Sequence, residues 1–200
     1  MILIKPLKRA LFAVSMVPAM ALGYFAYTGD LTANPVDYIE DFTGDWAIAF
    51  LVISLGITPL RRLTGWNEII RLRKMFGLVS FLYAFLHVLT WFALVSFFDV
   101  PTMVEDIAMR PFITIGMVTF VILSALAATS TKGAIRRMGR RWAQLHRLVY
   151  VAAILGVIHF WMAMKADIAE PRRWAVVLAI LLGMRVWWAW RKGTEGRKAA

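Results

Sequence analysis

The stretch RLRKMFGLVSFLYAFLHVLTW, at positions 71–91, sets three basic residues before an apolar run that continues to residue 98. An apolar run of this length can cross the hydrocarbon core of a bilayer as a helix, which takes about 17–25 residues. Basic residues beside a span collect on the cytoplasmic side of membrane proteins. The stretch therefore predicts a transmembrane helix with one cationic end and a histidine, His87, inside it.

Apolar stretches of the same kind run through the whole chain of 200 residues. Hydrophobic residues make up 60% of it and charged residues 18%, whereas soluble domains average roughly 45–50% and 25%. The segments between the stretches are polar, as they must be, because lipid cannot satisfy irregular backbone. We expect an all-α membrane protein, a single-domain bundle of six transmembrane helices, with spans at about 9–27, 45–60, 76–98, 112–130, 143–164 and 174–190.

The composition also excludes several classes of function. The chain contains no cysteine, which excludes disulfide bonds, thiolate metal sites and a catalytic thiol. It contains no phosphate-loop, dinucleotide-binding or nucleophile-elbow motif. The net charge of +11 would suggest nucleic acid in a soluble protein. In a membrane protein these cations act as topology signals, so we expect lipid and no nucleic acid as a partner.

The charged residues sort by side of the membrane. One set of loops and termini holds 17 of the 23 Lys and Arg residues and only two acids, in segments 5–9, 61–74, 132–141 and 191–198. The remaining ten acids lie in the alternate loops, at 28–45, 99–111 and 165–173. This alternation predicts six crossings of a membrane with both termini in the cytoplasm. The first stretch is then a retained helix, since its apolar run exceeds the 7–15 residues of a typical signal peptide.

The chain has three histidines, His87, His146 and His159, and all lie inside predicted spans. Ionisable side chains in a membrane are costly and usually mark function or face a cavity. His146 and His159 share one helix, about 20 Å and roughly 140° apart on an ideal helix. They can face the same partner only if the helix is irregular, and Gly156 between them marks a candidate position for such an irregularity.

Two imidazoles from neighbouring helices are a standard way to hold haem iron. Ala84 and Gly156 each lie three residues before a histidine and could leave bare backbone for a macrocycle. Small residues also let helices approach closely, which is their usual role. Haem propionates need cations at the membrane edge, and the candidates on the basic side are Arg71, Arg73, Lys74, Arg141 and Arg147.

The alternative is a transporter or channel in which the histidines line a path for protons or metal ions. That class favours acids or paired polar residues in mid-span and a broken helix beside the binding gap. Mid-span acids are absent from the predicted spans. The residues alone leave both classes open.

Four segments carry a resemblance to a known family. They are ITPLRRL (57–63), RLRKMFGLVSFLYAFLHVLTW (71–91), RPFITIGMVTFVILSALAATSTKGAIRRMGRRWAQLHRLVY (110–150) and VIHFWMAMK (157–165). Together these segments resemble MsrQ, the family of haem-binding membrane subunits of bacterial periplasmic methionine sulfoxide reductase systems. That family belongs to the ferric-reductase-like transmembrane superfamily. The resemblance covers nearly the whole chain.

The resemblance implies a b-type cytochrome of the bacterial inner membrane that passes electrons to a periplasmic, molybdopterin-containing catalytic subunit. The donor would be the quinone pool or a cytosolic flavin reductase, and FMN is attributed to the family. Such a chain is an electron-transfer subunit, and whether it counts as an enzyme stays open, because it has no substrate-transforming site of its own. Its repair role would be the reduction of methionine sulfoxide in oxidised periplasmic proteins.

The resemblance also assigns site residues. It pairs His87 with His159 on one haem b and leaves His146 to a second haem, a flavin or a propionate. Wider relatives use four histidines, two on each helix, but here the third span lacks the fourth, since Lys74 stands 13 residues before His87 and Val100 stands 13 after it. The expected cofactor-binding set is therefore His87, His159, His146, Arg73, Lys74 and Arg147, with the three histidines as metal ligands.

Overall fold

The computed structural model describes residues 4–164 and 168–198, so Lys165 and Asp167 of the last acidic loop lie outside the described residues. The described chain is helical throughout. Its elements are α1 (Ile4–Thr28), α2 (Pro35–Thr64), the 3₁₀ turn η1 (Asn67–Ile69), α3 (Ile70–Thr90), the π-helical turn η2 (Trp91–Val95), α4 (Val100–Met109), α5 (Pro111–Ala128), α6 (Lys132–Met138), α7 (Arg140–Leu145), α8 (Leu148–Ala163) and α9 (Ala169–Lys198).

Six segments of these helices are long and apolar enough to cross a membrane. Each overlaps one of the six apolar stretches expected from the sequence, and most of the helical segments are longer than predicted. The predicted ends at 98, 130 and 164 lie one to three residues beyond the corresponding segments. The acidic segment expected to be a loop before the second span is helical from Pro35 onward. Proline fits the first turn of a helix because its missing N–H needs no partner there. Hydropathy marks only the part of a helix that suits lipid, and helical hydrogen bonds continue beyond it into the polar interface.

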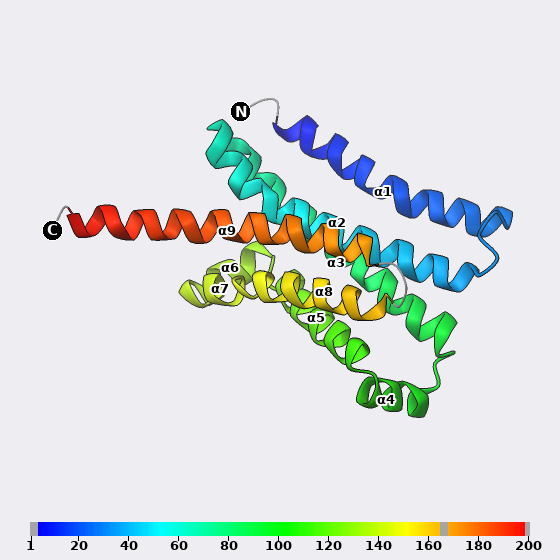
Figure 1. Ribbon diagram of the computed structural model, residues 1–200. Helices are drawn as coiled ribbons and strands as arrows, with labels where there is room; N and C mark the ends of the chain where they lie inside the picture. The colour runs from blue at the N-terminus through cyan, green and yellow to red at the C-terminus, as the bar shows by residue number, and fades with distance from the viewer. Residues whose placement is uncertain (1–3, 165–167, 199–200) are drawn as a thin grey trace.

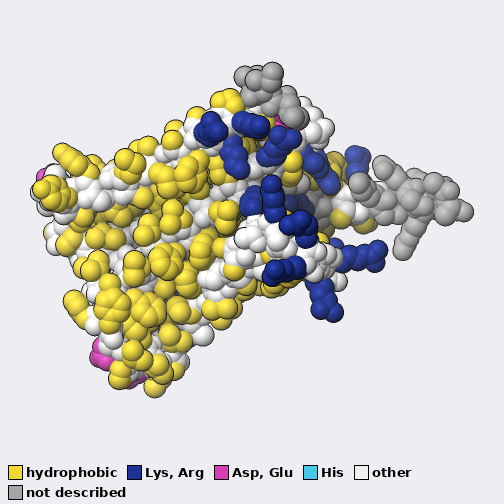
Figure 2. All heavy atoms as spheres, turned by 180° about the vertical axis from the view of Figure 1, so that it is seen from behind, with side chains coloured by type: hydrophobic (Ala, Val, Ile, Leu, Met, Phe, Trp, Pro, Cys, Tyr) yellow, Lys and Arg dark blue, Asp and Glu magenta, His cyan; other side chains and the backbone are white. Residues whose placement is uncertain are grey.

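The helices form a bundle in which successive membrane-spanning segments run in opposite directions (Figure 1). Two antiparallel pairs have the most extensive contacts, α2 with α3 and α5 with α8. The start of α1 and the end of α9 lie at the same end of the bundle. Figure 2 shows the Lys and Arg side chains gathered at one end, here called the basic end, with hydrophobic side chains over much of the remaining surface. The opposite, acidic end carries the start of α2 and helix α4.

Serine side chains join α2 to α3 across their interface. Ser54 donates a hydrogen bond to the Arg73 carbonyl at 2.8 Å, and Ser80 donates to the Ala47 carbonyl at 2.8 Å. Both serines are buried. Small residues and interhelical hydrogen bonds are what hold helices together in lipid, where burial of apolar surface gives no driving force. This pairing fixes the depth and rotation of α3, and with them the position of His87.

A tyrosine hydroxyl enters the hydrogen-bond ladder of α1 beside Pro18. Tyr83 of α3, which is fully buried, donates to the Ser15 carbonyl at 2.8 Å and accepts from the Ala19 N–H at 3.1 Å. In an uninterrupted helix these two backbone groups would bond each other. Insertion of a side chain into the ladder is one of the recognised causes of a helix bend. Tyr83 thereby ties α1 to the bundle four residues before His87.

A second proline, Pro59, leaves one backbone carbonyl of α2 without its helical hydrogen-bond donor. Pro59 has no N–H, so the Leu55 carbonyl, four residues before it, loses its helical donor. Arg185 of α9 supplies a replacement: one terminal amino group donates to the Leu55 carbonyl and the other to the Tyr150 hydroxyl at 3.0 Å. Leu55 is completely buried. Arg185 therefore connects α9 to α2 and α8 through a group that the sequence leaves unsatisfied.

Replacement of Arg185 by methionine is expected to lower the free energy of unfolding by about 1–3 kcal/mol, the usual cost of leaving a buried acceptor without a partner. Thermal unfolding in detergent measures this. In a Pro59→Ala background the new N–H of residue 59 can bond the Leu55 carbonyl, so the same Arg185→Met change should cost less. An equal cost in both backgrounds would show that Arg185 acts by another contact.

Candidate functional site

A cavity of about 270 Å³ lies among α2, α3, α5 and α8. This volume approaches the range of ligand-binding pockets, roughly 300–1,000 Å³. Its charged lining residues are Glu40, Asp41, Asp45 and Arg110, which lie toward the acidic end, and its inner part is lined by apolar residues such as Leu51 and Leu123. The cavity therefore suits a largely apolar ligand with one polar edge.

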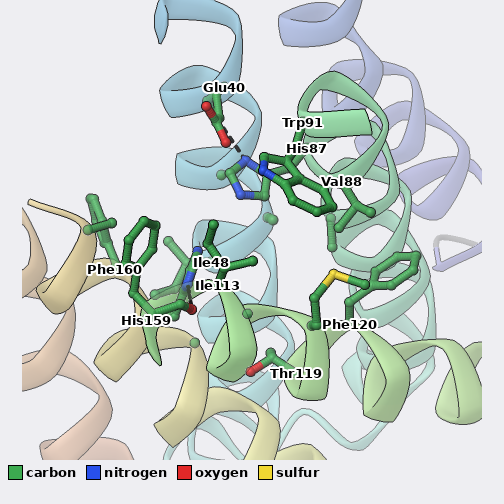
Figure 3. Close-up of a pocket in the computed structure, with 18 of the residues that line it drawn as sticks. Glu40, Ile48, His87, Val88, Trp91, Ile113, Thr119, Phe120, His159 and Phe160 are labelled. Carbon is green, nitrogen blue, oxygen red and sulfur yellow. Dashed lines mark hydrogen bonds between the residues drawn. The ribbon is translucent and has the colours of Figure 1, made fainter. Parts of the chain in front are cut away.

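Two histidines project into this cavity from different helices, His87 from α3 and His159 from α8 (Figure 3). Their ring centroids are 6.0 Å apart and their planes meet at 79°. Each ring is half-buried, since one side of it faces the cavity. The fold thus brings together two imidazoles that are far apart in the sequence.

Each imidazole is oriented by a backbone carbonyl of the helix paired with its own. His87 Nδ1 lies 2.9 Å from the Glu40 carbonyl oxygen, and His159 Nδ1 lies 2.7 Å from the Phe112 carbonyl oxygen. A carbonyl can only accept, so Nδ1 carries the proton in both rings and donates it. Nε2 is then the nitrogen with a free lone pair in each ring. Such a bond from the second ring nitrogen is the usual way to fix a metal-binding histidine.

A glycine makes room for each ring. A Cβ atom on Gly44 would lie 3.2 Å from His87 Nδ1, and one on Gly116 would lie 2.8 Å from His159 Cε1. In both cases the glycine is the fourth residue after the one whose carbonyl accepts the bond. The two carbonyl–histidine pairs also have the same separation of 47 residues. The pair α2/α3 and the pair α5/α8 therefore build the same arrangement of one histidine, one carbonyl and one glycine, here called a half-site.

The geometry fits a metal ion between the rings. Bonds from zinc to imidazole nitrogen are about 2.0–2.1 Å long. Since each nitrogen lies about 1.1 Å from its ring centroid, a metal midway between two imidazoles separates the centroids by roughly 6 Å. The observed 6.0 Å agrees with this. Two neutral imidazoles that line one largely apolar cavity are a donor set that suits the iron of haem, whose macrocycle supplies the other ligands.

Comparison with known proteins identifies the family of this chain. Residues 43–157 match the family model described as ferric reductase like transmembrane component. A protein-methionine-sulfoxide reductase heme-binding subunit MsrQ from Herminiimonas arsenicoxydans is 47% identical over 97% of this chain and 90% of that protein. The chain belongs to the MsrQ family, within the ferric-reductase-like transmembrane family.

Other proteins named MsrQ have a similar sequence identity to this chain. The MsrQ of Ralstonia nicotianae is 45% identical over 96% of this chain and 90% of its own length. The MsrQ of Rhodospirillum rubrum is 43% identical over 94% and 91% respectively. The region matched by the family model includes His87 and both ring-facing glycines, whereas His159 lies two residues beyond it.

In this MsrQ chain, His146 does not line the cavity. Its Nε2 lies 3.0 Å from the Thr129 hydroxyl, and its ring stacks on Trp142 with centroids 4.1 Å apart. The irregularity expected at Gly156 occurs instead at His146 and Arg147, where α7 ends and α8 begins, and Gly156 lies within regular α8. The break places His146 at the basic end, apart from the other two histidines.

The cations expected to hold propionates also lie apart from the cavity. Arg73, Lys74 and Arg147 are absent from its lining, and within residues 4–164 and 168–198 the positively charged lining residue is Arg110. These cations and the two cavity histidines lie at opposite ends of the same helices. Arg73 and Lys74 are in the first turns of α3 and Arg147 precedes α8, whereas His87 and His159 lie near the ends of those two helices.

Sequence reasoning did not find Gly44, Gly116 or Arg110 as site residues of this MsrQ chain. A signal for the glycines was present in the sequence: each is followed by a histidine at the same distance. Ala84 and Gly156, the small residues chosen from the sequence, do line the cavity. The close approaches to the rings, however, come from glycines on the partner helices.

Proposed function

We propose that this chain is a b-type cytochrome that carries electrons across a bacterial inner membrane to a periplasmic methionine sulfoxide reductase. The observation that supports this most directly is the His87–His159 pair, with its 6.0 Å centroid separation and both Nδ1 atoms held by carbonyls. Haem b bound between them would supply one-electron chemistry at its iron. Relatives at 43–47% identity are named as heme-binding subunits of protein-methionine-sulfoxide reductase.

The chain's own residues would control the site in three ways. The Glu40 and Phe112 carbonyls hold both imidazoles in one orientation and in the tautomer that carries the proton on Nδ1 and leaves Nε2 free. The apolar inner lining, which includes Phe120 and Leu123, excludes water from that part of the cavity. Ligand identity, hydrogen bonding and burial are the means by which a protein sets the potential of such a centre.

The distribution of charge supports a direction for transfer. The basic end would face the cytoplasm, by the positive-inside rule, and both termini would lie there. The cavity then lies toward the periplasmic side, where the acids of α2 and α4 would receive a molybdopterin-containing partner. A quinone or a cytosolic flavin reductase would deliver electrons at the basic end, whose cations suit an acidic protein face or a flavin phosphate.

The cavity lining favours this function over transport. A path for protons or metal ions needs polar groups or water through the depth of the membrane. The inner part of this cavity is instead lined mainly by apolar residues, among them Leu51, Phe120 and Leu123. Electrons do not need such a polar path.

The role of His146 belongs to the same proposal. Its position at the basic end, beside Thr129 and Trp142, suits a second haem or an FMN near the donor. A second haem there would need a sixth ligand other than histidine or would keep an open position.

Absorption spectra of the purified protein, oxidised and dithionite-reduced, with haem and flavin quantified per chain, test the proposal. We expect sharp reduced b-type bands in the wild-type protein. His146→Ala should keep the haem between His87 and His159 and lose the cofactor at the basic end, either about half the haem or the flavin. A protein that stays colourless after expression with added haem would contradict the proposed function. An unchanged cofactor content in His146→Ala would contradict only the role of His146.

A further inference from the structure

The polar edge of the cavity carries more negative than positive charge, and the two signs lie on different helices. Among the residues that the structure describes, three lining carboxylates, those of Glu40, Asp41 and Asp45, lie on α2, and the one lining cation, Arg110, lies across the cavity at the start of α5. The histidines are neutral when they serve as ligands. An anionic group on a ligand would therefore be attracted to the α5 side of this edge and repelled by the α2 side.

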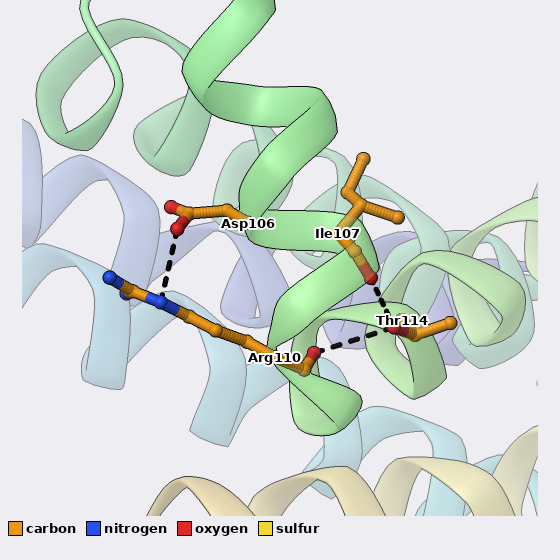
Figure 4. Close-up of polar contacts among 4 residues, drawn as sticks. All are labelled: Asp106, Ile107, Arg110 and Thr114. Atoms are coloured by element: carbon orange, nitrogen blue, oxygen red, sulfur yellow. Dashed lines mark hydrogen bonds and ion pairs between the residues drawn. The ribbon is translucent and has the colours of Figure 1, made fainter.

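Arg110 is built into the same structure that orients His159. It directly precedes Pro111 at the first turn of α5, two residues before Phe112, whose carbonyl holds the His159 ring. Its Nε pairs with Asp106 at 3.0 Å, and its carbonyl accepts a hydrogen bond from the Thr114 hydroxyl (Figure 4). Thr114 also donates to the Ile107 carbonyl, so α4 and α5 meet in a fixed corner. The position of Arg110 is thus determined by backbone and side-chain bonds.

The ion pair leaves donors available on Arg110. Asp106 pairs through Nε, so the two terminal amino groups of the guanidinium are not part of that pair. The side chain is 57% exposed although its residue lines the cavity. A guanidinium offers its N–H groups in a planar fork that matches a carboxylate. The first turn of α5 adds the partial positive charge of a helix N-terminus on the same side.

Haem b is a ligand with this polarity, because its macrocycle is apolar and one edge carries two propionate carboxylates. Burial of a carboxylate without a partner is very costly. The inner end of the cavity, with Leu51, Phe120 and Leu123, offers such a group no compensation. The propionates must then lie at the edge, and on its α5 side, away from the acids of α2.

We propose that Arg110 binds the propionate carboxylates of the haem held between His87 and His159, as a positioning residue for that haem. This inference rests on the proposed function. It assigns the anionic edge of the haem to the acidic end of the bundle, and not to Arg73, Lys74 or Arg147 at the basic end.

The test is a comparison of two ligands, haem b and haem b dimethyl ester, in which the propionates are uncharged. Each is titrated into the full-length apoprotein in phosphatidylcholine nanodiscs, and binding is followed by the bis-imidazole absorption band. Wild-type protein should bind haem b roughly 10- to 100-fold more tightly than the ester, the range of a charge-assisted hydrogen bond. In Arg110→Gln this preference should fall to within a few-fold, with affinity for the ester nearly unchanged. Arg110→Lys should restore part of the preference.

Two control variants separate charge recognition from packing. Asp106→Asn removes the ion pair and keeps the cation, so the preference for haem b should remain. Arg172→Gln removes an exposed cation near the start of α9 that does not line the cavity, and it should also leave the preference intact. An undiminished preference in Arg110→Gln would overturn the inference, and so would an equal loss in Asp106→Asn. A wild-type protein that binds neither ligand with a bis-imidazole band would refute the proposed function, and this inference with it.

Discussion

His87→Ala and His159→Ala should each reduce the haem bound between α3 and α8 by more than tenfold. Each change removes one of two ligands, and the remaining imidazole cannot complete the axial pair. Loss of groups that only orient a metal ligand typically costs 10- to 100-fold in affinity, and loss of the ligand itself should cost more. Haem per chain and the reduced absorption spectrum of the purified variants measure the effect.

Loss of fold must be separated from loss of ligand in this experiment. Each histidine ring already lines the cavity, so its replacement by alanine enlarges an existing space and does not disturb a packed core. The helix content and the detergent-solubilised yield should therefore stay close to wild type. Imidazole added to the medium should restore part of the haem in each variant, because it can occupy the vacated position. Full haem content with an unchanged spectrum in both variants would show that these histidines are not the ligands.

Gly116→Ala should have the second-largest effect, a loss of about 10- to 100-fold in affinity for haem. The added Cβ would lie 2.8 Å from His159 Cε1 and 2.9 Å from its Nδ1, closer than packed atoms allow. The nearby atoms belong to the ring that must stay in place for the 2.7 Å bond to the Phe112 carbonyl. The ring therefore has to move, and both its orientation and its hydrogen bond change together. Haem titration into the apoprotein measures the loss.

A graded series of glycine replacements gives this prediction its control. Gly183→Ala lies within α9 with nothing within 4 Å of the added Cβ, so it should leave haem affinity unchanged. Gly44→Ala brings a Cβ to 3.2 Å from His87 Nδ1, a milder contact, and should fall between the other two. The order Gly183, Gly44, Gly116 is set by distance alone. A series in which Gly116→Ala behaves like Gly183→Ala would show that the ring has room that the structure does not indicate.

The two half-sites explain why the sequence pointed to the histidines and missed their support. A histidine inside an apolar stretch is conspicuous in any membrane protein, because its burial needs a reason. A glycine in such a stretch is ordinary, and a backbone carbonyl has no signature in the sequence. The residues that orient His87 and His159 are of these two inconspicuous kinds: Gly44 and Gly116, with the carbonyls of Glu40 and Phe112.

The sequence by itself determined the number of candidate membrane spans, the alternation of charge between the two ends and the presence of three histidines within those spans. These properties depend on the length of apolar runs and on the position of charges along the chain. Both determine directly which segments are stable in a bilayer and which stay outside it.

Only the tertiary structure decided which histidines meet, which cation reaches the cavity and which donor satisfies the carbonyl that Pro59 leaves free. These outcomes depend on the rotation and depth of each helix relative to its neighbours. In lipid, hydrophobicity does not distinguish one rotation from another, because every apolar face is equally well solvated. Close contacts at small residues and hydrogen bonds between helices make the choice, as those of Ser54, Ser80 and Arg185 do here.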